Sequence, residues 1–259
     1  MTTSIMKNKL ILPLNKALKQ IFIVFIILAL WECAALLIND SYFLPDIAKT
    51  LVALAKIVVS KGFFNVVFTG IYRVFAGLFI GTFISILLAT LCYKITFLKE
   101  LFSPFISIMK ATPVACIIVL LWIRFNYTQI AILVVVLMVT PIIWQNVLDG
   151  YESIDSGLFE VTEVFELNAA KKIRFLYIPS LLNYLIPALI TSVGLAWKAE
   201  VAAEIMTNSN IGRLIYDYKT VSYDTASIFA WTVIIVSMSI LFETLTKRLL
   251  RRLMNGLNN

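Results

Sequence analysis

The 259-residue chain is 61% hydrophobic and only 14% charged, whereas soluble globular domains carry about a quarter charged residues. This composition excludes an ordinary soluble enzyme and places the chain among membrane proteins. The net charge of +7 does not indicate a nucleic-acid partner, because Lys and Arg accumulate on the cytoplasmic loops of membrane proteins. The absence of histidine excludes zinc-protease motifs and Ser-His or Cys-His nucleophile systems.

Six segments are long and apolar enough to cross the roughly 30 Å hydrocarbon core of a bilayer as helices. They cover residues 21–38, 74–93, 101–123, 125–148, 175–197 and 225–242. The first is interpreted as a span and not as a cleavable signal peptide, because it is long and lacks a small-x-small cleavage site. An even number of spans puts both termini on the same side of the membrane.

The basic residues of the two tails indicate which side that is. Tail 1–20 and tail 247–259 are both rich in Lys and Arg. The positive-inside tendency therefore places both tails in the cytoplasm. Residues 21–246 between them are expected to form a single six-helix transmembrane domain.

A second helical pattern follows the first span and begins at Asp46, directly after Leu44-Pro45. Lys49, Lys56 and Ser60 fall on one narrow face of this helix and the rest is apolar. The helix is therefore expected to lie at the outer membrane interface without crossing it. Segment 198–224 is expected to form turns on the same outer side.

Small side chains recur every four residues in the second span, at Gly77, Gly81, Ser85 and Ala89. Such a stripe lets another helix approach closely, so it predicts helix packing and says nothing about a solute. Arg73 and Glu32 lie near the ends of spans, where a long charged side chain is expected to snorkel toward the interface.

The segment 149–174, between the fourth and fifth spans, holds six of the chain's fifteen acidic residues. On a helical period it has an apolar stripe, formed by Leu158, Val161, Val164 and Phe165, and an acidic stripe, formed by Glu160, Glu163 and Glu166. Asp155 or Ser156 can cap the start of this helix. An anionic inner leaflet repels clustered acids, so a protein partner is favoured over a helix that rests on headgroups.

The same segment resembles the E-A-A-x-x-x-G loop of ABC importer permeases. Glu160 stands at the Glu of that motif, Val161 and Thr162 at its alanines and Glu166 at its glycine, and Pro179 matches the downstream proline. The resemblance covers nearly the whole chain and points to the nitrate/sulfonate/taurine branch of these permeases. It also rests on Trp31-Glu32 and on the stretches FLPDIAKTLVAL, IYRVFAGLFIGTFISI, LFSPFISIMKATPVACIIVLLWI and GLAWKAEVAAEIM.

The resemblance implies an all-α type I ABC importer permease fold, with the helix at Asp46 as an outer interfacial helix and the acidic segment as a cytoplasmic coupling helix. It implies a bacterial inner-membrane protein that pairs with a second permease copy as a homodimer. Two copies of an ABC ATPase would bind ATP and Mg²⁺, and an extracytoplasmic protein would deliver the solute. The coupling residues would be Glu160, Val161, Glu163, Val164, Phe165, Glu166, Leu167, Ala169 and Ala170.

The chain itself has no G-x-x-x-x-G-K-[ST] motif, and none of its nine glycines is followed by Lys. It is therefore expected to have no ATPase site of its own, to be a transport subunit and not an enzyme, and to need no cofactor or metal.

The candidates for the solute pathway or its gates are Lys110, Thr112, Pro113, Trp197, Lys198, Glu200 and Glu204. Lys110 lies deep in an apolar run, where a charge is costly unless it faces water or a partner, so the pathway is favoured over a structural ion pair. Lys198 and Glu200 can instead form an interfacial pair. For Glu204 an outer gate and a structural hydrogen bond stay equally open.

The family resemblance indicates a small organic anion, such as a sulfonate or taurine, or nitrate as the solute. A heterocyclic vitamin or its precursor, carried by the same class of importer, is the alternative. A secondary transporter driven by an ion gradient should show repeated halves with broken helices at matching positions, and no half-repeat is visible.

Overall fold

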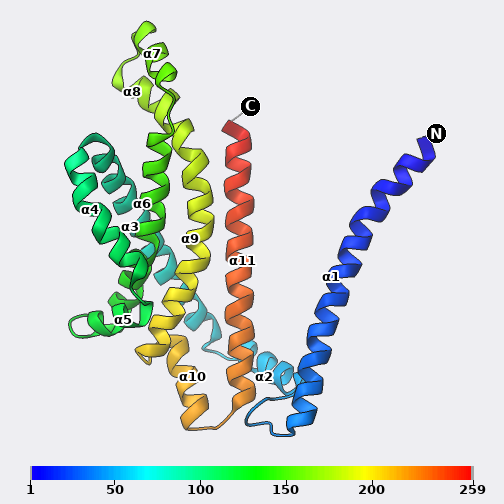
Figure 1. The fold of residues 1–259 in the computed structure, drawn as a ribbon. Helices are drawn as coiled ribbons and strands as arrows, with labels where there is room; N and C mark the ends of the chain where they lie inside the picture. The colour runs from blue at the N-terminus through cyan, green and yellow to red at the C-terminus, as the bar shows by residue number, and fades with distance from the viewer. Residues whose placement is uncertain (1, 258–259) are drawn as a thin grey trace. The chain divides into compact units, whose positions relative to one another are not determined.

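The computed structural model describes residues 2–257, and the side chains of residues 18–252, and it is built from helices. Residue 1 of tail 1–20 and residues 258–259 of tail 247–259 lie outside the described residues. The helices in Figure 1 are α1 (Thr2–Ile38), α2 (Ile47–Val59), α3 (Phe63–Lys94), α4 (Thr96–Ala111), α5 (Val114–Trp122), α6 (Tyr127–Glu152), α7 (Ser156–Val164), α8 (Ala169–Lys172), the π-helical turn Ile173–Tyr177, α9 (Ile178–Met206), α10 (Asn210–Thr220) and α11 (Thr225–Leu257).

Five helical stretches of the described chain are long and apolar enough to cross a membrane. They are Leu18–Ile38, Phe63–Lys94, Tyr127–Glu152, Ala169–Met206 and Thr225–Arg252. A sixth span is obtained when α4 and α5 are counted together, although they are bent by 101°. The predicted all-α membrane architecture is therefore confirmed.

The third predicted span, 101–123, is not one straight helix. It breaks between α4 and α5, where Thr112 and Pro113 adopt extended backbone with ψ of 124° and 134°. Proline lacks an N–H donor, and its ring disfavours helical backbone in the residue before it. The third predicted span is therefore present as a broken span, with its break at Pro113.

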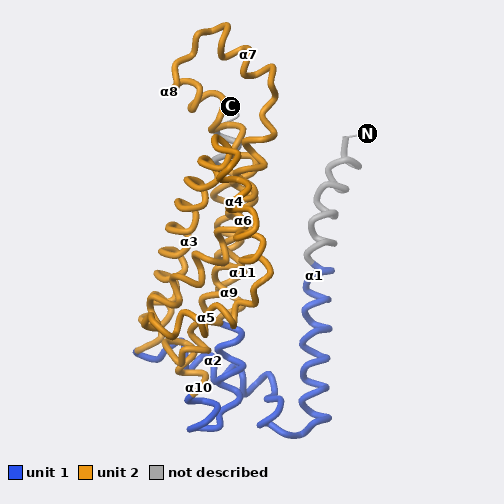
Figure 2. Tube along the Cα trace, turned by 60° about the vertical axis from the view of Figure 1, so that its left-hand side comes forward, with its two compact units in different colours: residues 1–61, 217–234 blue, residues 62–216, 235–259 orange. Residues whose placement is uncertain are grey.

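The chain divides into two compact units, one made of residues 1–61 and 217–234 and the other of residues 62–216 and 235–259 (Figure 2). In the larger unit, α3, α6 and α9 pack around a core that includes Val74, Val139, Ile143 and Trp144. The stripe of small residues on α3 faces α6. A Cβ added at Gly81 would lie 2.5 Å from Val139, so only a glycine permits this approach and the predicted packing role is confirmed.

The smaller unit contains the turn between α1 and α2. Asp46 caps α2 by accepting a hydrogen bond from the Lys49 amide at 2.7 Å, which confirms the predicted start of this helix. Glu32 was expected to snorkel to the interface, but its carboxylate accepts a hydrogen bond from the Ile47 amide at 3.0 Å. It therefore helps to satisfy the free N–H groups at the start of α2.

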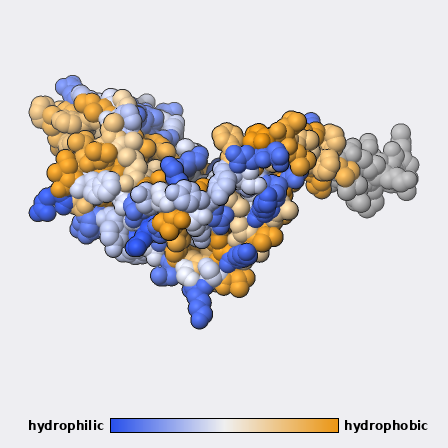
Figure 3. Space-filling model, turned by 90° about the horizontal axis from the view of Figure 1, so that it is seen from below, coloured by the Kyte–Doolittle hydropathy of each residue, from blue (hydrophilic) through white to orange (hydrophobic). Residues whose placement is uncertain are grey.

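Large apolar side chains lie exposed on the helices, for example Phe22, Phe79 and Phe83, each more than 60% exposed. Hydrophobic patches among hydrophilic ones are also visible in the view of Figure 3. Apolar surface of this extent suits contact with lipid.

In segment 198–224, α9 continues to Met206, and the predicted turns are found at residues 207–209 and 221–224, on either side of α10.

Candidate functional site

The charged segment after α6 folds as two short helices, α7 and α8, joined by a tight turn. Asp155 caps α7, because its carboxylate accepts a hydrogen bond from the Gly157 amide at 2.7 Å. Asn168 caps α8 by accepting from the Lys171 amide at 2.9 Å. The predicted helix and its cap are thus present, and a second capped helix follows at once.

The turn between the two helices is a Schellman motif centred on Glu166. The Leu167 amide donates to the Thr162 carbonyl at 3.0 Å, and the Glu166 amide donates to the Glu163 carbonyl at 2.9 Å. Glu166 has a φ of 47°, the left-handed conformation that this motif requires at its C′ position. Glycine adopts this conformation most readily, and Glu166 is the residue that aligns with the glycine of the E-A-A-x-x-x-G loop.

The apolar side chains of α7 and of the turn are largely exposed. Val164 is 80% exposed, Phe165 71%, Val161 49% and Leu158 46%. Of the nine predicted coupling residues only Leu167 is half-buried, and the other eight are exposed. The three acids of the segment, Glu160, Glu163 and Glu166, form no ion pair within the described part of the chain.

The other side of α7 packs against the rest of the larger unit. Thr162 is 5% exposed, and the Phe159 ring lies edge-on to Tyr177, with centroids 6.2 Å apart. Tyr177 packs on Tyr151 at 5.7 Å, and Tyr151 stacks on Tyr93 at 4.7 Å. A continuous series of aromatic rings therefore joins α7 to the π-helical turn before α9, to α6 and to α3.

Lys110, Thr112 and Pro113 lie together at the bend between α4 and α5. The Lys110 ammonium is exposed, donates a long hydrogen bond of 3.4 Å to Gln145 Oε1, and makes no ion pair among the described residues. The Thr112 hydroxyl donates to the Ile108 carbonyl at 2.7 Å. The structural ion pair weighed for Lys110 is therefore absent from the described chain.

Arg73 is buried in the larger unit, with 4% of its surface exposed. The expectation that it snorkels to the interface is wrong. Its guanidinium donates to Glu204 Oε1 at 2.7 Å and to the Thr128 hydroxyl at 3.1 Å, and it lies over the Tyr127 ring at 5.8 Å. The ion pair offsets the cost of placing the guanidinium inside an apolar span.

Glu204 is fully buried and accepts two more hydrogen bonds besides the one from Arg73. Its Oε1 accepts from Asn210 Nδ2 at 2.8 Å and its Oε2 from the Ile211 amide at 3.1 Å, which also satisfies the start of α10. Asn210 donates further to the Val66 carbonyl at 3.0 Å. Of the two roles left open for Glu204, the structure shows the hydrogen-bonded one.

Glu200 is also fully buried, with Oε1 4.0 Å from Arg73 Nη1. It lies against Gly70, where an added Cβ would be 3.6 Å from Oε2. Lys198 is exposed and does not bond to it, so the expected Lys198–Glu200 pair is wrong. Successive residues of a helix are turned by about 100°, which puts positions two apart on different faces.

Trp197 is 2% exposed, donates its indole N–H to the Ile235 carbonyl at 3.0 Å and packs on Phe242. Of the four polar or aromatic candidates on α9, only Lys198 therefore presents an exposed side chain. The Arg73–Glu204 pair was not expected, although two opposite charges within apolar spans are a signal for such a pair.

The chain is similar to known transport proteins in sequence. A profile of the family described as "binding-protein-dependent transport system inner membrane component" matches residues 81–255. The putative aliphatic sulfonates transport permease protein SsuC of Bacillus subtilis (strain 168) is 23% identical over 245 residues, which are 93% of this chain and 88% of that protein. The bicarbonate transport system permease protein CmpB of Synechocystis sp. is 27% identical over 176 residues, 66% of this chain and 62% of that protein.

Two solved structures are similar to this chain in fold. An inward-facing form of the MetNI methionine ABC transporter matches 75% of this chain and 99% of its own, with a TM-score of 0.59 at 17% identity. An amino acid ABC transporter with histidines matches 73% of this chain and 91% of its own, with a TM-score of 0.58 at 16% identity. At such low identity the likeness concerns the fold alone.

Proposed function

Because the chain belongs to the family of binding-protein-dependent transport system inner membrane components and has the type I fold of ABC importer permeases, we propose that α7 and α8 couple it to a separate ATPase. The observation that carries this proposal is the exposed helix–turn–helix, whose left-handed Glu166 stands at the position of the motif glycine. A turn of this kind makes the end of α7 protrude, and we call this exposed end with its turn, residues 160–167, the knob.

The surface of this knob has the composition of a protein interface. Val164 and Phe165 are highly exposed apolar side chains at its tip. Covering a side chain of this size is worth roughly 1.5–3 kcal/mol, so these two residues supply most of the affinity in the proposal. Glu160, Glu163 and Glu166 supply register and specificity toward basic groups of the ATPase.

Motion of the docked knob is transmitted through the rings that anchor it. The aromatic series consists of rings in successive contact, from Phe159 through Tyr177 and Tyr151 to Tyr93. A displacement of α7 therefore displaces its neighbours α9, α6 and α3. When two ATPase subunits close on ATP and Mg²⁺, both knobs of a permease pair move with them. The pathway between the two copies then alternates between its inward-open and outward-open packings.

The proposed assembly contains two permease copies, two ATPase subunits and an extracytoplasmic solute-binding protein. With the knob on the ATPase side, α7, α8 and both termini lie in the cytoplasm of a bacterial cell. Neither ATP nor Mg²⁺ is bound by the permease chain in this scheme, since the chain lacks a P-loop sequence.

A small anion of the sulfonate class is the proposed solute, with taurine and nitrate as related candidates. The names of the two relatives refer to aliphatic sulfonates and to bicarbonate, both of them anions. Lys110 supports the proposal, because its ammonium is exposed beside the bend of a broken span and has no acidic partner among the described residues. Such a charge lowers the barrier for an anion.

Replacement of one knob residue tests the coupling. We expect Phe165→Asp to abolish co-purification of the ATPase subunit, because a carboxylate cannot be buried in an apolar groove without a partner. Val221→Asp, at a 73% exposed residue in the turn after α10, is the matched control and should leave co-purification unchanged. Wild-type recovery of the ATPase with Phe165→Asp would refute the docking role of α7.

A further inference from the structure

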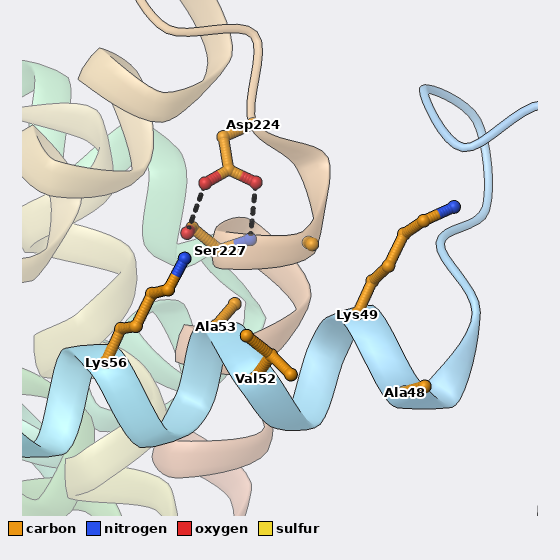
Figure 4. Close-up of a pocket in the computed structure, with 8 residues that line it drawn as sticks. Ala48, Lys49, Val52, Ala53, Lys56, Asp224 and Ser227 are labelled. Atoms are coloured by element: carbon orange, nitrogen blue, oxygen red, sulfur yellow. Dashed lines mark hydrogen bonds between the residues drawn. The ribbon is translucent and has the colours of Figure 1, made fainter.

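A pocket of about 440 Å³ lies within the smaller unit, between α2 and the beginning of α11. The residues that matter for its chemistry are Lys49, Val52, Ala53, Lys56, Asp224 and Ser227. Figure 4 shows Lys56 extending from α2 toward the end of the pocket formed by Asp224 and Ser227, whereas Lys49 extends in another direction. The pocket therefore has a basic wall on α2 and an acidic group directly before α11.

The two lysines differ in what they bind. Lys49 is committed, because its ammonium forms an ion pair with Asp46 at 2.9 Å and donates to the Ser41 hydroxyl at 2.7 Å. Lys56 is exposed, and within the described part of the chain it forms neither an ion pair nor a side-chain hydrogen bond. Its ammonium is available to an anionic group that enters the pocket.

Asp224 supplies the opposite charge. Its two carboxylate oxygens accept hydrogen bonds from the Ser227 amide at 3.1 Å and from the Ser227 hydroxyl at 2.6 Å. Asp224 therefore caps the start of α11. Each oxygen keeps a second lone pair, and Asp224 has no ion-pair partner among the described residues. An ammonium group in the pocket can therefore donate to it.

The helix that carries Lys56 has the pattern of an interfacial helix. Thr50, Ala53 and Ile57 form its buried face, and Leu51 and Val59 are exposed at 58% and 84%. At about 100° per residue, Lys49 and Lys56 fall at the border between these two faces. In a bilayer the exposed apolar face lies among acyl chains and the lysines reach the phosphate level.

We propose that this pocket binds the headgroup of a phospholipid that carries a primary ammonium, with the phosphate at Lys56 and the ammonium at Asp224. A headgroup with negative charge only would be repelled by Asp224, and a cationic one by Lys56. A choline headgroup has the same two charges but no N–H to donate to the carboxylate. Phosphatidylethanolamine is therefore the lipid class that matches both walls, and the exposed apolar residues beside the pocket favour a lipid over a soluble zwitterion.

Native mass spectrometry of the full-length chain, purified with the subunits that accompany it, tests this proposal. Equal amounts of phosphatidylethanolamine, phosphatidylcholine and phosphatidylglycerol are added, and the retained lipids are quantified. The wild type should retain phosphatidylethanolamine over phosphatidylcholine. Lys56→Gln should lower the amount of retained phosphatidylethanolamine about fivefold, the expected worth of one lysine at a lipid surface. Asp224→Asn should bring the ratio of phosphatidylethanolamine to phosphatidylcholine toward one, while asparagine still caps the helix. Lys61→Gln, at an exposed lysine outside the pocket, should change nothing.

Several outcomes would overturn the proposal. Equal retention of phosphatidylcholine would remove the role of the ammonium, and preference for phosphatidylglycerol would reduce the pocket to a basic surface. Displacement of the lipid by millimolar phosphoethanolamine would identify a soluble zwitterion as the ligand in its place. Lys56 forms no ion pair among the described residues that its loss could disturb. A well-folded Lys56→Gln variant that retains as much phosphatidylethanolamine as the wild type would therefore also refute the proposal. None of these results depends on ATPase docking.

Discussion

Replacement of Arg73 by methionine should destabilise the larger unit more than any exposed substitution. Arg73 is 4% exposed, and its partner Glu204 is fully buried at 2.7 Å, with Glu200 beside them. Methionine fills a similar volume but leaves the Glu204 carboxylate buried without its cation. Removal of one member of a buried pair costs about 3–5 kcal/mol, because the remaining charge has lost its solvent and its partner.

The same geometry predicts that a second substitution recovers part of the loss. Glu204→Gln keeps one oxygen, which can accept from Asn210 or from the Ile211 amide, and it removes the charge that Arg73 neutralises. The double variant Arg73→Met with Glu204→Gln should therefore be more stable than Arg73→Met alone. We expect a coupling energy of about 2–3 kcal/mol in the double-mutant cycle.

Unfolding of the purified chain in mixed micelles, followed by circular dichroism, measures these free energies. Arg124→Met is the matched control at an exposed arginine between α5 and α6, and it should shift the free energy of unfolding by less than about 0.5 kcal/mol. If Arg73→Met costs no more than this control, or if the losses of the two single variants simply add, the buried pair does not hold the helices together.

Three further predictions concern the knob and the pathway. Glu166→Gly should stabilise the turn by about 1 kcal/mol, which slower amide exchange in the turn would show. Glu163→Gly, within α7, should destabilise the helix by about the same free energy. Faster amide exchange in Glu166→Gly would contradict the left-handed assignment. Lys110→Ala should lower sulfonate uptake into vesicles. Lys94→Ala, at another exposed lysine, is the control. Unchanged uptake by Lys110→Ala would remove Lys110 from the pathway. Tyr177→Ala should leave ATPase co-purification intact but lower the uptake per ATP hydrolysed, since it interrupts the aromatic series.

Local features of the chain were predictable from sequence where neighbouring residues decide them. Asp46 precedes an apolar period and caps α2, and Asp155 caps α7 in the same way. The every-fourth-residue stripe that includes Gly81 predicted close packing, which α6 provides. Each of these follows from the periodicity of a helix and from the free amides at its start.

Features that depend on tertiary contacts were missed. Arg73 and Glu204 are 131 residues apart, and an arginine near the end of an apolar run has the same local signal whether it reaches the interface or a buried partner. Trp197, a candidate for the solute pathway, packs inside the larger unit against Phe242. The bend at Pro113 had a local cause, but its angle of 101° depends on how α5 packs afterwards.

The charges of the chain separate into those it satisfies itself and those it leaves for another molecule. Inside the larger unit, Arg73 and Glu204 meet each other, because an unpaired charge there would cost more than the pair. The knob at the end of α7 is the opposite case: Phe165 is 71% exposed, and the acids beside it have no ion-pair partner in the described chain. An exposed phenylalanine beside a left-handed Glu166 does nothing for the solubility of that surface, and this arrangement supports the proposal that a partner protein covers both residues.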